Sequence, residues 1–263
     1  MSNLLATDLL VRQLPIVLGG TAIGLLYGIF GVGSAFATPM LALLGVPGMA
    51  AVVGPLPALL PGSAAGAWSY SREGEVDWVV ARRALAGGLP AAVVGALAST
   101  VVGGPVLLVL SGAVLLVVGI RVLRPTAATA AAAERAERRR SSARFVVTTA
   151  TVVGFASGLL ANGGGFLLVP LFLLLLGLDM NRASGTSLVV ASALTVPTLV
   201  VHVGLGDIDY AVAAAFALGL VPGAFLGARL AVRLPTHRLQ RAFGALLVIV
   251  AVWFLARQVA PLI

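Results

Sequence analysis

Long apolar runs follow one another along almost the whole of this 263-residue chain, and they limit its fold more than any other feature. Only 10% of the residues are charged, and the mean hydropathy is +1.09. A soluble domain of this length needs a polar surface, whereas lipid accepts an apolar one. The sequence therefore predicts an all-α integral membrane protein, because helices satisfy their own backbone hydrogen bonds in lipid.

About ten apolar segments can be drawn, each with the length of a membrane helix or of a shorter embedded piece. They cover 13–30, 32–46, 48–69, 84–102, 105–123, 145–161, 164–178, 184–204, 211–231 and 239–259. The second and the seventh are short for a full span. Each of these two is therefore either a short tilted helix that crosses the membrane or a re-entrant half-helix.

The distribution of arginine favours the count in which all ten segments cross. All 17 basic residues are arginine, and positive charge concentrates in cytoplasmic loops. If the polar stretch 124–144 is cytoplasmic and every segment crosses, only Arg12 and Arg257 lie outside. If the two short segments re-enter, five arginines move outside, namely Arg182, Arg229, Arg233, Arg238 and Arg241. We therefore expect both termini outside, and a mature N-terminus without a cleavable signal peptide.

The chain also contains an internal repeat, with a first transmembrane half at 1–123, an Arg-rich polar cytoplasmic linker at 124–144 and a second half at 145–263. Glycines and prolines recur in both halves at an offset of 130 to 132 residues. The matched positions are Gly24 with Gly154, Gly28 with Gly158, Pro39 with Pro170, Gly45 with Gly177, Gly87 with Gly219, Pro90 with Pro222 and Gly95 with Gly227. A further match pairs Gly74-Glu75-Val76-Asp77-Trp78 with Gly206-Asp207-Ile208-Asp209-Tyr210, which is hard to attribute to chance similarity of apolar sequences.

Five segments in each half make the predicted repeat an inverted one, because the second half then enters the membrane with the opposite polarity. Carriers with inverted repeats hold their substrate near the membrane midplane, where interrupted helices meet. This sequence has such interruptions at matching places in its two halves. They are Gly31 to Ser34, followed by Pro39, and Asn162 to Gly165, followed by Pro170.

The second interruption lies in the pattern Gly154-Phe-Ala-Ser-Gly158-Leu-Leu-Ala-Asn162-Gly-Gly-Gly165-Phe-Leu-Leu-Val-Pro170, with Gly185-Thr186-Ser187 further on. In this pattern, and over nearly its whole length, the chain resembles the TauE/SafE sulfite-exporter-like family of membrane proteins. The first half departs from the pattern, since Gly33-Ser34-Ala35 stands where a glycine triplet is usual. The resemblance implies transport, generally outward, of small sulfur-containing or organic anions such as sulfite or sulfonates. We expect a multi-pass protein of the bacterial cytoplasmic (inner) membrane.

The glycine-rich turns are the candidate substrate site. A glycine run that opens a helix leaves backbone N–H groups unpaired and uncrowded, and the helix dipole adds partial positive charge, so an oxyanion suits it. The predicted substrate-binding residues are Gly31, Gly33, Ser34, Asn162, Gly163, Gly164, Gly165, Thr186 and Ser187. Two alternatives stay open: the glycines can serve close helix packing alone, and the two hydroxyls can bind their own backbone.

Ionisable side chains are almost absent from the apolar segments. No Asp or Glu lies in any of them, so a carboxylate proton relay is not supported, and His202 is the candidate for proton coupling. His202 is equally compatible with an interfacial role. Asp77 and Asp209 are predicted to cap helices, with Trp78 and Tyr210 as anchors at the membrane interface.

The remaining composition excludes several classes of function. The chain has no cysteine and only 2 histidines, so it offers no thiolate chemistry and no metal cluster, and we predict no cofactor. It has no phosphate-binding loop, and its one Arg cluster is too short for a nucleic-acid-binding domain. We expect no enzymatic activity. The expected partners are a small anionic substrate and membrane lipid, a homodimer is compatible with the sequence, and an anion channel or, less readily, a membrane-embedded enzyme are the alternatives to a carrier.

Overall fold

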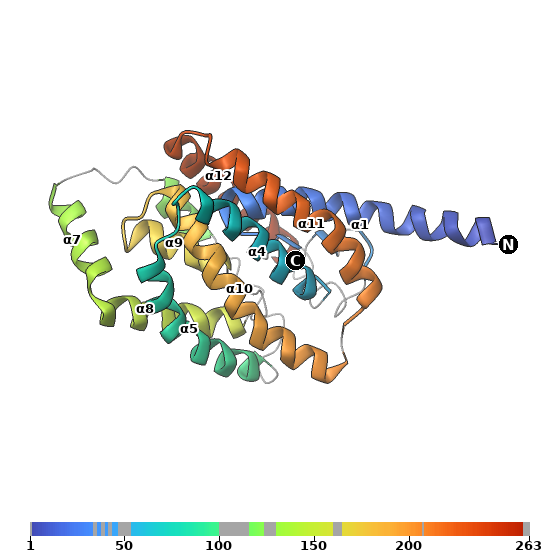
Figure 1. Cartoon of the computed structure of the whole chain (residues 1–263), viewed down its shortest axis with the longest axis horizontal. Coiled ribbons are helices and arrows are strands. Elements are labelled where there is room, and N and C mark those ends of the chain that lie inside the picture. The colour runs from blue at the N-terminus through green and yellow to red at the C-terminus, as the bar shows by residue number, and fades with distance from the viewer. Residues whose placement is uncertain are drawn as a thin grey trace.

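The computed structural model describes residues 2–33, 36–37, 40–41, 44–46, 54–99, 116–123, 130–159, 165–206 and 208–259. All regular secondary structure within these ranges is helical, as the apolar pattern predicted (Figure 1). The helices are α1 (Ser2–Phe30), α4 (Leu56–Arg72), α5 (Trp78–Ser99), α7 (Ala130–Ser141), α8 (Ala143–Leu159), α9 (Gly165–Leu174), α10 (Met180–Leu205), α11 (Tyr210–Ala231) and α12 (Thr236–Val259). A further helical stretch covers 116–123.

Four of the described helices are long and apolar enough to cross a membrane, and a fifth span results if the bent pair α7 and α8 is counted as one. The four windows are Gln13–Phe30, Trp78–Ala98, Met180–Gly204 and Tyr210–Ala231. The predicted segments 32–46, 48–69 and 105–123 lie partly outside the described residues. The total of ten embedded segments therefore stays a prediction.

Helix α9 has the length of a half-span. It contains 10 residues, which rise about 15 Å, whereas the hydrocarbon core of a bilayer is about 30 Å thick. Because residues 160–164 before α9 lie outside the described residues, the choice between a short crossing helix and a re-entrant half-helix for the seventh apolar segment stays open. After α9 the chain turns at Gly177, which has a φ of +63°, and enters α10.

Aspartate side chains mark where three helices begin, and this extends two of them beyond the apolar runs of the sequence. The carboxylate of Asp77 accepts hydrogen bonds from the N–H groups of Val79 and Val80 at the start of α5. Asp209 does the same for α11, and Asp179 caps α10 by accepting from the N–H of Arg182. The predicted capping roles of Asp77 and Asp209 are thus confirmed.

Two helix pairs meet backbone to backbone through glycine. Helix α1 packs along α11, and α5 packs along α8. A Cβ atom at Gly28 would collide with the carbonyl oxygen of Ala224, and one at Gly158 would collide with that of Ala92. Glycine permits this approach because it has no side chain, and small residues commonly bring membrane helices together in this way.

The contacts of the two pairs correspond to one another under the repeat. The first helix of each half packs on a late helix of the other half, and matching residues meet matching carbonyls. The corresponding contacts are Gly24 on Leu220 with Gly154 on Gly88, Gly28 on Ala224 with Gly158 on Ala92, Gly219 on Val17 with Gly87 on Val147, and Gly227 on Leu25 with Gly95 on Phe155. Residues of α1 and the equivalent residues of α8 differ by 130 in number, and residues of α5 and the equivalent residues of α11 differ by 132.

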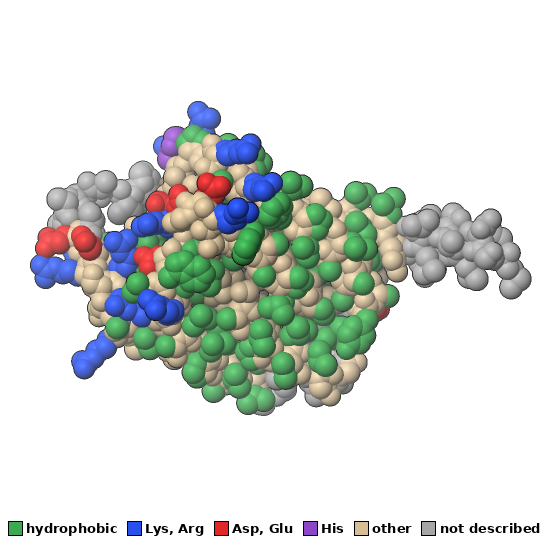
Figure 2. Space-filling model, viewed as in Figure 1, with side chains coloured by type: hydrophobic (Ala, Val, Ile, Leu, Met, Phe, Trp, Pro, Cys, Tyr) green, Lys and Arg blue, Asp and Glu red, His purple; other side chains and the backbone are tan. Residues whose placement is uncertain are grey.

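Charged side chains gather at one end of the molecule, and hydrophobic side chains are spread over the rest of the visible face (Figure 2). At this end α7 meets α8 at an angle of 83°, and the guanidinium of Arg139 lies 5.3 Å from the centre of the Phe145 ring. Large apolar side chains such as Leu18 and Leu218 are 60% and 70% exposed, which fits contact with lipid. The positive-inside rule requires one arginine-rich end. That this end is the cytoplasmic one stays a prediction.

The glycine contacts give the first testable expectation. Gly28→Ala and Gly158→Ala each place a methyl group against a backbone carbonyl, so the helices must separate, at a cost of about 1–3 kcal/mol. Gly204→Ala is the matched control, because a Cβ at this position of α10 meets nothing within 4 Å. Thermal unfolding in detergent should show lower midpoints for the first two variants only. Equal midpoints for all three would contradict the close packing.

Candidate functional site

The first interruption lies where α1 ends and the chain turns against the second half. The N–H of Gly31 donates to the carbonyl of Tyr27 (2.8 Å), and Gly31 then takes a φ of +70°, which favours glycine. A Cβ at Gly31 would lie 3.0 Å from Cγ2 of Val169 and 3.1 Å from the backbone of Ser184. The turn of the first half therefore sits between α9 and α10 of the second half.

A new helical turn starts directly after this break. The carbonyl of Gly33 accepts hydrogen bonds from the N–H groups of Phe36 (3.1 Å) and Ala37 (3.2 Å). Gly33 lies beneath the side chain of Tyr27, with which an added Cβ would collide. The predicted interruption of the first half is thus present as a break between two helical pieces.

The second interruption is only partly described. Gly165 is the first residue of α9, while Asn162, Gly163 and Gly164, together with Ser34 of the first turn, lie outside the described residues. Their predicted contact with an anion stays a prediction.

The two predicted hydroxyl residues are both fully buried on α10. Thr186 holds the loop between α4 and α5, because its Oγ1 accepts a hydrogen bond from the N–H of Asp77 at 3.0 Å. Neighbouring Gly185 lies against the carbonyl of Glu75 in the same loop. Thr186 therefore anchors a first-half loop on the second half, close to the charged end.

His202 lies at the other end of the same helix. It is half-buried in the last turn of α10, where its carbonyl accepts from the N–H of Gly206. Sixteen residues separate it from Thr186, which corresponds to about 24 Å along a helix. The structure does not bring His202 together with the predicted hydroxyl residues.

Two tyrosines near the first break were not identified from the sequence. The hydroxyl of Tyr70 on α4 lies 3.0 Å from the carbonyl oxygen of Gly28 and 3.1 Å from that of Ile29, so it closes the end of α1. Tyr27 is fully buried, and its hydroxyl has no hydrogen-bond partner in the described part of the chain. The one available signal was the position of Tyr27, a single helical turn before Gly31.

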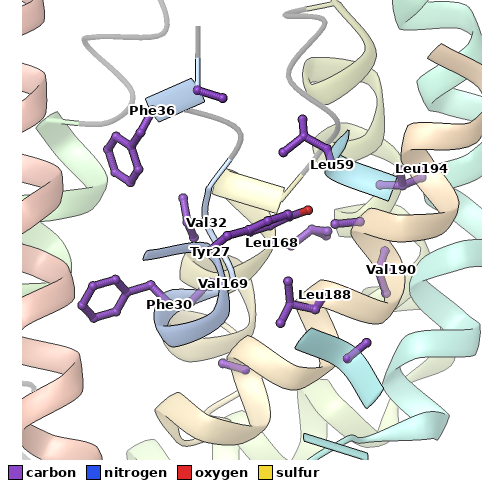
Figure 3. Packing of buried hydrophobic residues seen from close by; sticks show 14 of the residues in the cluster. Tyr27, Phe30, Val32, Phe36, Leu59, Leu168, Val169, Leu188, Val190 and Leu194 are labelled. Atoms are coloured by element: carbon purple, nitrogen blue, oxygen red, sulfur yellow. The ribbon is translucent and has the colours of Figure 1, made fainter. Parts of the chain in front are cut away.

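The close view shows where the Tyr27 hydroxyl points. Its ring extends from α1 past Val32 and Leu168, toward the side on which Leu59 of α4 and Leu194 of α10 lie (Figure 3). Leu194 is near the middle of α10, so the hydroxyl is directed into the interior rather than toward the charged end.

The buried polar side chains are electrically neutral throughout the described residues. They are Ser63, Ser69, Ser157, Asn181, Ser184, Thr186, Ser187, Thr195 and Thr198. The hydroxyl oxygen of Ser184, like that of Tyr27, has no hydrogen-bond partner there. An interior of this kind can donate hydrogen bonds to a ligand but offers it no opposite charge.

Positive charge is found instead in a surface cavity of about 320 Å³ between α5, α7 and α10. Arg83, Arg140 and Arg182 line it together with Asp77. Nη1 of Arg83 donates to the carbonyls of Arg140 (2.9 Å) and Ser141 (3.1 Å), which ties α7 to α5. Beside the cavity, partial burial and the nearby Asp179 raise the pKa of the Glu75 carboxyl, against the opposing effect of Arg182.

Comparison with known proteins places the chain in a family of membrane proteins. The family described as "Sulfite exporter TauE/SafE" matches residues 16–254, so the chain belongs to that family. A "Probable membrane transporter protein" of Xylella fastidiosa (strain 9a5c) is 38% identical over 112 residues, 42% of this chain and 43% of the relative. The "Probable membrane transporter protein YjnA" of Bacillus subtilis (strain 168) is 28% identical over 98 residues, 37% of this chain and 39% of the relative.

These alignments cover well under half the length of the curated relatives. No solved structure matches the chain.

The contact made by Tyr70 can be tested by removing one oxygen atom. Tyr70→Phe leaves the carbonyls of Gly28 and Ile29 without their donor, which should lower the free energy of unfolding by about 1 kcal/mol. Tyr210→Phe is the control, because Tyr210 is 66% exposed. Thermal unfolding in detergent measures both, and a Tyr70→Phe midpoint equal to that of the control would contradict the role assigned to this hydroxyl.

Proposed function

We propose that this chain is a membrane transporter that exports small sulfur-containing or organic anions, such as sulfite or sulfonates, by alternating access. The observation that carries the proposal is the broken end of α1, where the Gly31 turn of one half is seated between α9 and α10 of the other. Broken helices at the contact of two repeats are where carriers of this type bind their substrates. Membership of the family and the names of the relatives support a transporter.

The anion site in this proposal is formed by the two glycine turns, at Gly31 to Ser34 and at Asn162 to Gly165. Gly165 opens α9, so the N-terminal N–H groups and the dipole of that helix favour a negative charge at the second turn. Thr186 and Ser187 complete the proposed set from α10. The arginine-lined cavity beside α7 concentrates anions at the mouth of the pathway.

The two halves in this proposal form an inverted repeat. The matching glycine contacts of α1 with α11 and of α8 with α5 support a pseudo-two-fold relation between the halves. The loop at 73–77 binds the start of α10 through Thr186, whereas the corresponding loop at 206–209 follows the end of α10. Thr186 and Gly206 are 20 residues apart in the sequence, so the two loops lie about 30 Å apart along the helix, as an inversion requires.

Alternating access follows from how the helices are grouped. Each glycine pair lacks side chains at its contact, so α1 with α11, and α5 with α8, move as rigid units. Helix α10 touches α5 of one unit and α4, which packs on α11 of the other unit, so α10 lies between the two units. Rocking of one unit against the other around the Gly31 turn opens the site to one side at a time.

The inverted arrangement predicts opposite accessibility for two corresponding loop positions. Since the chain has no cysteine, Glu75→Cys and Asp207→Cys each introduce a single thiol. A membrane-impermeant thiol reagent added to intact cells should label Asp207→Cys, and should label Glu75→Cys only after permeabilisation. Labelling of both from the same side would contradict the inversion while leaving transport itself untouched.

Transport is tested by flux into proteoliposomes of labelled sulfite, thiosulfate, sulfoacetate, sulfate and chloride. Wild type should carry a sulfur oxyanion selectively and saturably. Asn162→Ala should weaken uptake by about tenfold or more, since it removes a donor to a charged group, and Gly164→Leu should abolish it by filling the turn. Gly204→Ala serves as the folded control.

Two results would contradict the proposal. Absence of flux for every anion, with folded protein verified, rejects transport altogether. A non-saturating anion conductance would instead assign the same fold to a channel.

A further inference from the structure

The interior of this protein offers hydrogen-bond donors without any charge, and this restricts what it can carry. The sequence contains no Asp, Glu, Arg, Lys or His between residues 13 and 71, or between 145 and 178. The buried polar side chains that the structure describes are likewise all neutral. An anion that enters therefore gives up its water without gaining a counter-charge from a side chain.

Hydroxyl groups occupy corresponding positions in the two halves. Tyr27 and Ser63 are both fully buried in the first half. The repeat offsets of 130 and 132 match them to Ser157 and Thr195, which are 2% and 0% exposed in the second half. Two buried hydroxyls at matching places in each half indicate one polar region shared between the halves.

Of these buried hydroxyl groups, that of Tyr27 is the one for which the described residues offer no hydrogen-bond acceptor. The hydroxyl of Ser63 is directed at the carbonyl oxygens of Leu59 (2.8 Å) and Leu60 (2.9 Å), and that of Thr195 at the carbonyl of Ala191 (2.8 Å). The Ser63 hydroxyl is near enough to that of Tyr27 to interact with it, but the two groups do not have the distance and angles of a hydrogen bond. The Tyr27 hydroxyl is thus a completely buried donor that the described part of the chain does not satisfy.

Such a group is costly to keep unless a ligand uses it. A buried donor left without an acceptor costs about 1–3 kcal/mol. Phenylalanine would fill the same space between α1, α4 and α9 without this penalty. The hydroxyl also points into the interior, toward the middle of α10 (Figure 3).

We propose that the Tyr27 hydroxyl donates a hydrogen bond to the transported anion, and that this neutral site takes singly charged oxyanions in preference to doubly charged ones. The inference rests on the proposed transport function. The cost of moving an ion from water to an apolar medium rises with the square of its charge, so a dianion costs about four times as much as a monoanion. Hydroxyl and N–H donors can compensate for one charge, whereas two would require a buried cation.

The substrate class is therefore hydrogensulfite and organic monosulfonates, rather than the sulfite dianion or sulfate. The arginines of the surface cavity do not alter this preference, because they stand at the mouth, outside the uncharged segments. Their positive potential concentrates every anion at the mouth, and a dianion more than a monoanion. The choice between a monoanion and a dianion is made further inside.

The charge preference is tested by flux into proteoliposomes across the pH range in which hydrogensulfite loses its proton. Uptake of labelled sulfite should follow the fraction of hydrogensulfite, uptake of methanesulfonate should stay constant, and sulfate should not enter. Methanesulfonate carries one charge at every pH used, so proton coupling would change its uptake as well. Sulfate uptake at the rate of methanesulfonate, or sulfite uptake that is greatest for the dianion, would overturn the inference.

The role of Tyr27 is tested by Tyr27→Phe, with Tyr210→Phe as the control on the surface. Tyr27→Phe should raise the KM for methanesulfonate about tenfold or more, while its thermal unfolding midpoint in the absence of substrate stays equal to or above that of wild type. An unchanged KM would overturn the role of this hydroxyl, and a lowered midpoint would assign it to structure. If no anion is carried at all, the proposed function fails first.

Discussion

The backbone contacts of α1 with α11 and of α8 with α5 are the interactions on which the other features depend. In lipid the hydrophobic effect does not drive helices together, so van der Waals contact between closely fitting surfaces must do it. Gly28 and Gly158 allow such contact because they have no side chain to separate the two helix backbones. Because α1 is held against α11, its broken end is fixed where the Gly31 turn meets α9 and α10. The geometry of the candidate site therefore originates in contacts made along the length of α1.

Much of this architecture could be predicted from the sequence. Apolar runs indicated the helices, since lipid leaves the backbone little alternative. Asp77 and Asp209 indicated helix starts, because a carboxylate can satisfy the first N–H groups of a helix. The repeat matched Gly24 and Gly28 to Gly154 and Gly158, and the structure uses both pairs in equivalent helix contacts.

Other features could not be predicted from the sequence, for physical reasons. A helix that is apolar all round gives no sign of which face is buried, so the interior positions of Tyr27 and Tyr70 could not be read from it. The half-length of α9 depends on where the chain turns, at Gly177, and apolar residues continue past that point. The sequence predicted a ligand for Thr186 but not the hydrogen bond that its oxygen accepts from the N–H of Asp77. Such long-range pairs have no signature in the local pattern.

The first helix of each half packs on a helix of the other half, and this also affects the order in which the chain can fold. Residues of α1 find their glycine-matched partner only in α11, almost the whole chain later, whereas α8 meets α5 across a much shorter stretch. Closing the larger loop carries the greater entropic penalty, and contacts of high sequence separation form slowly. During synthesis α1 therefore enters the bilayer with its small-residue face uncovered. That face stays without its partner until α11 has been synthesised. The half made first is completed last.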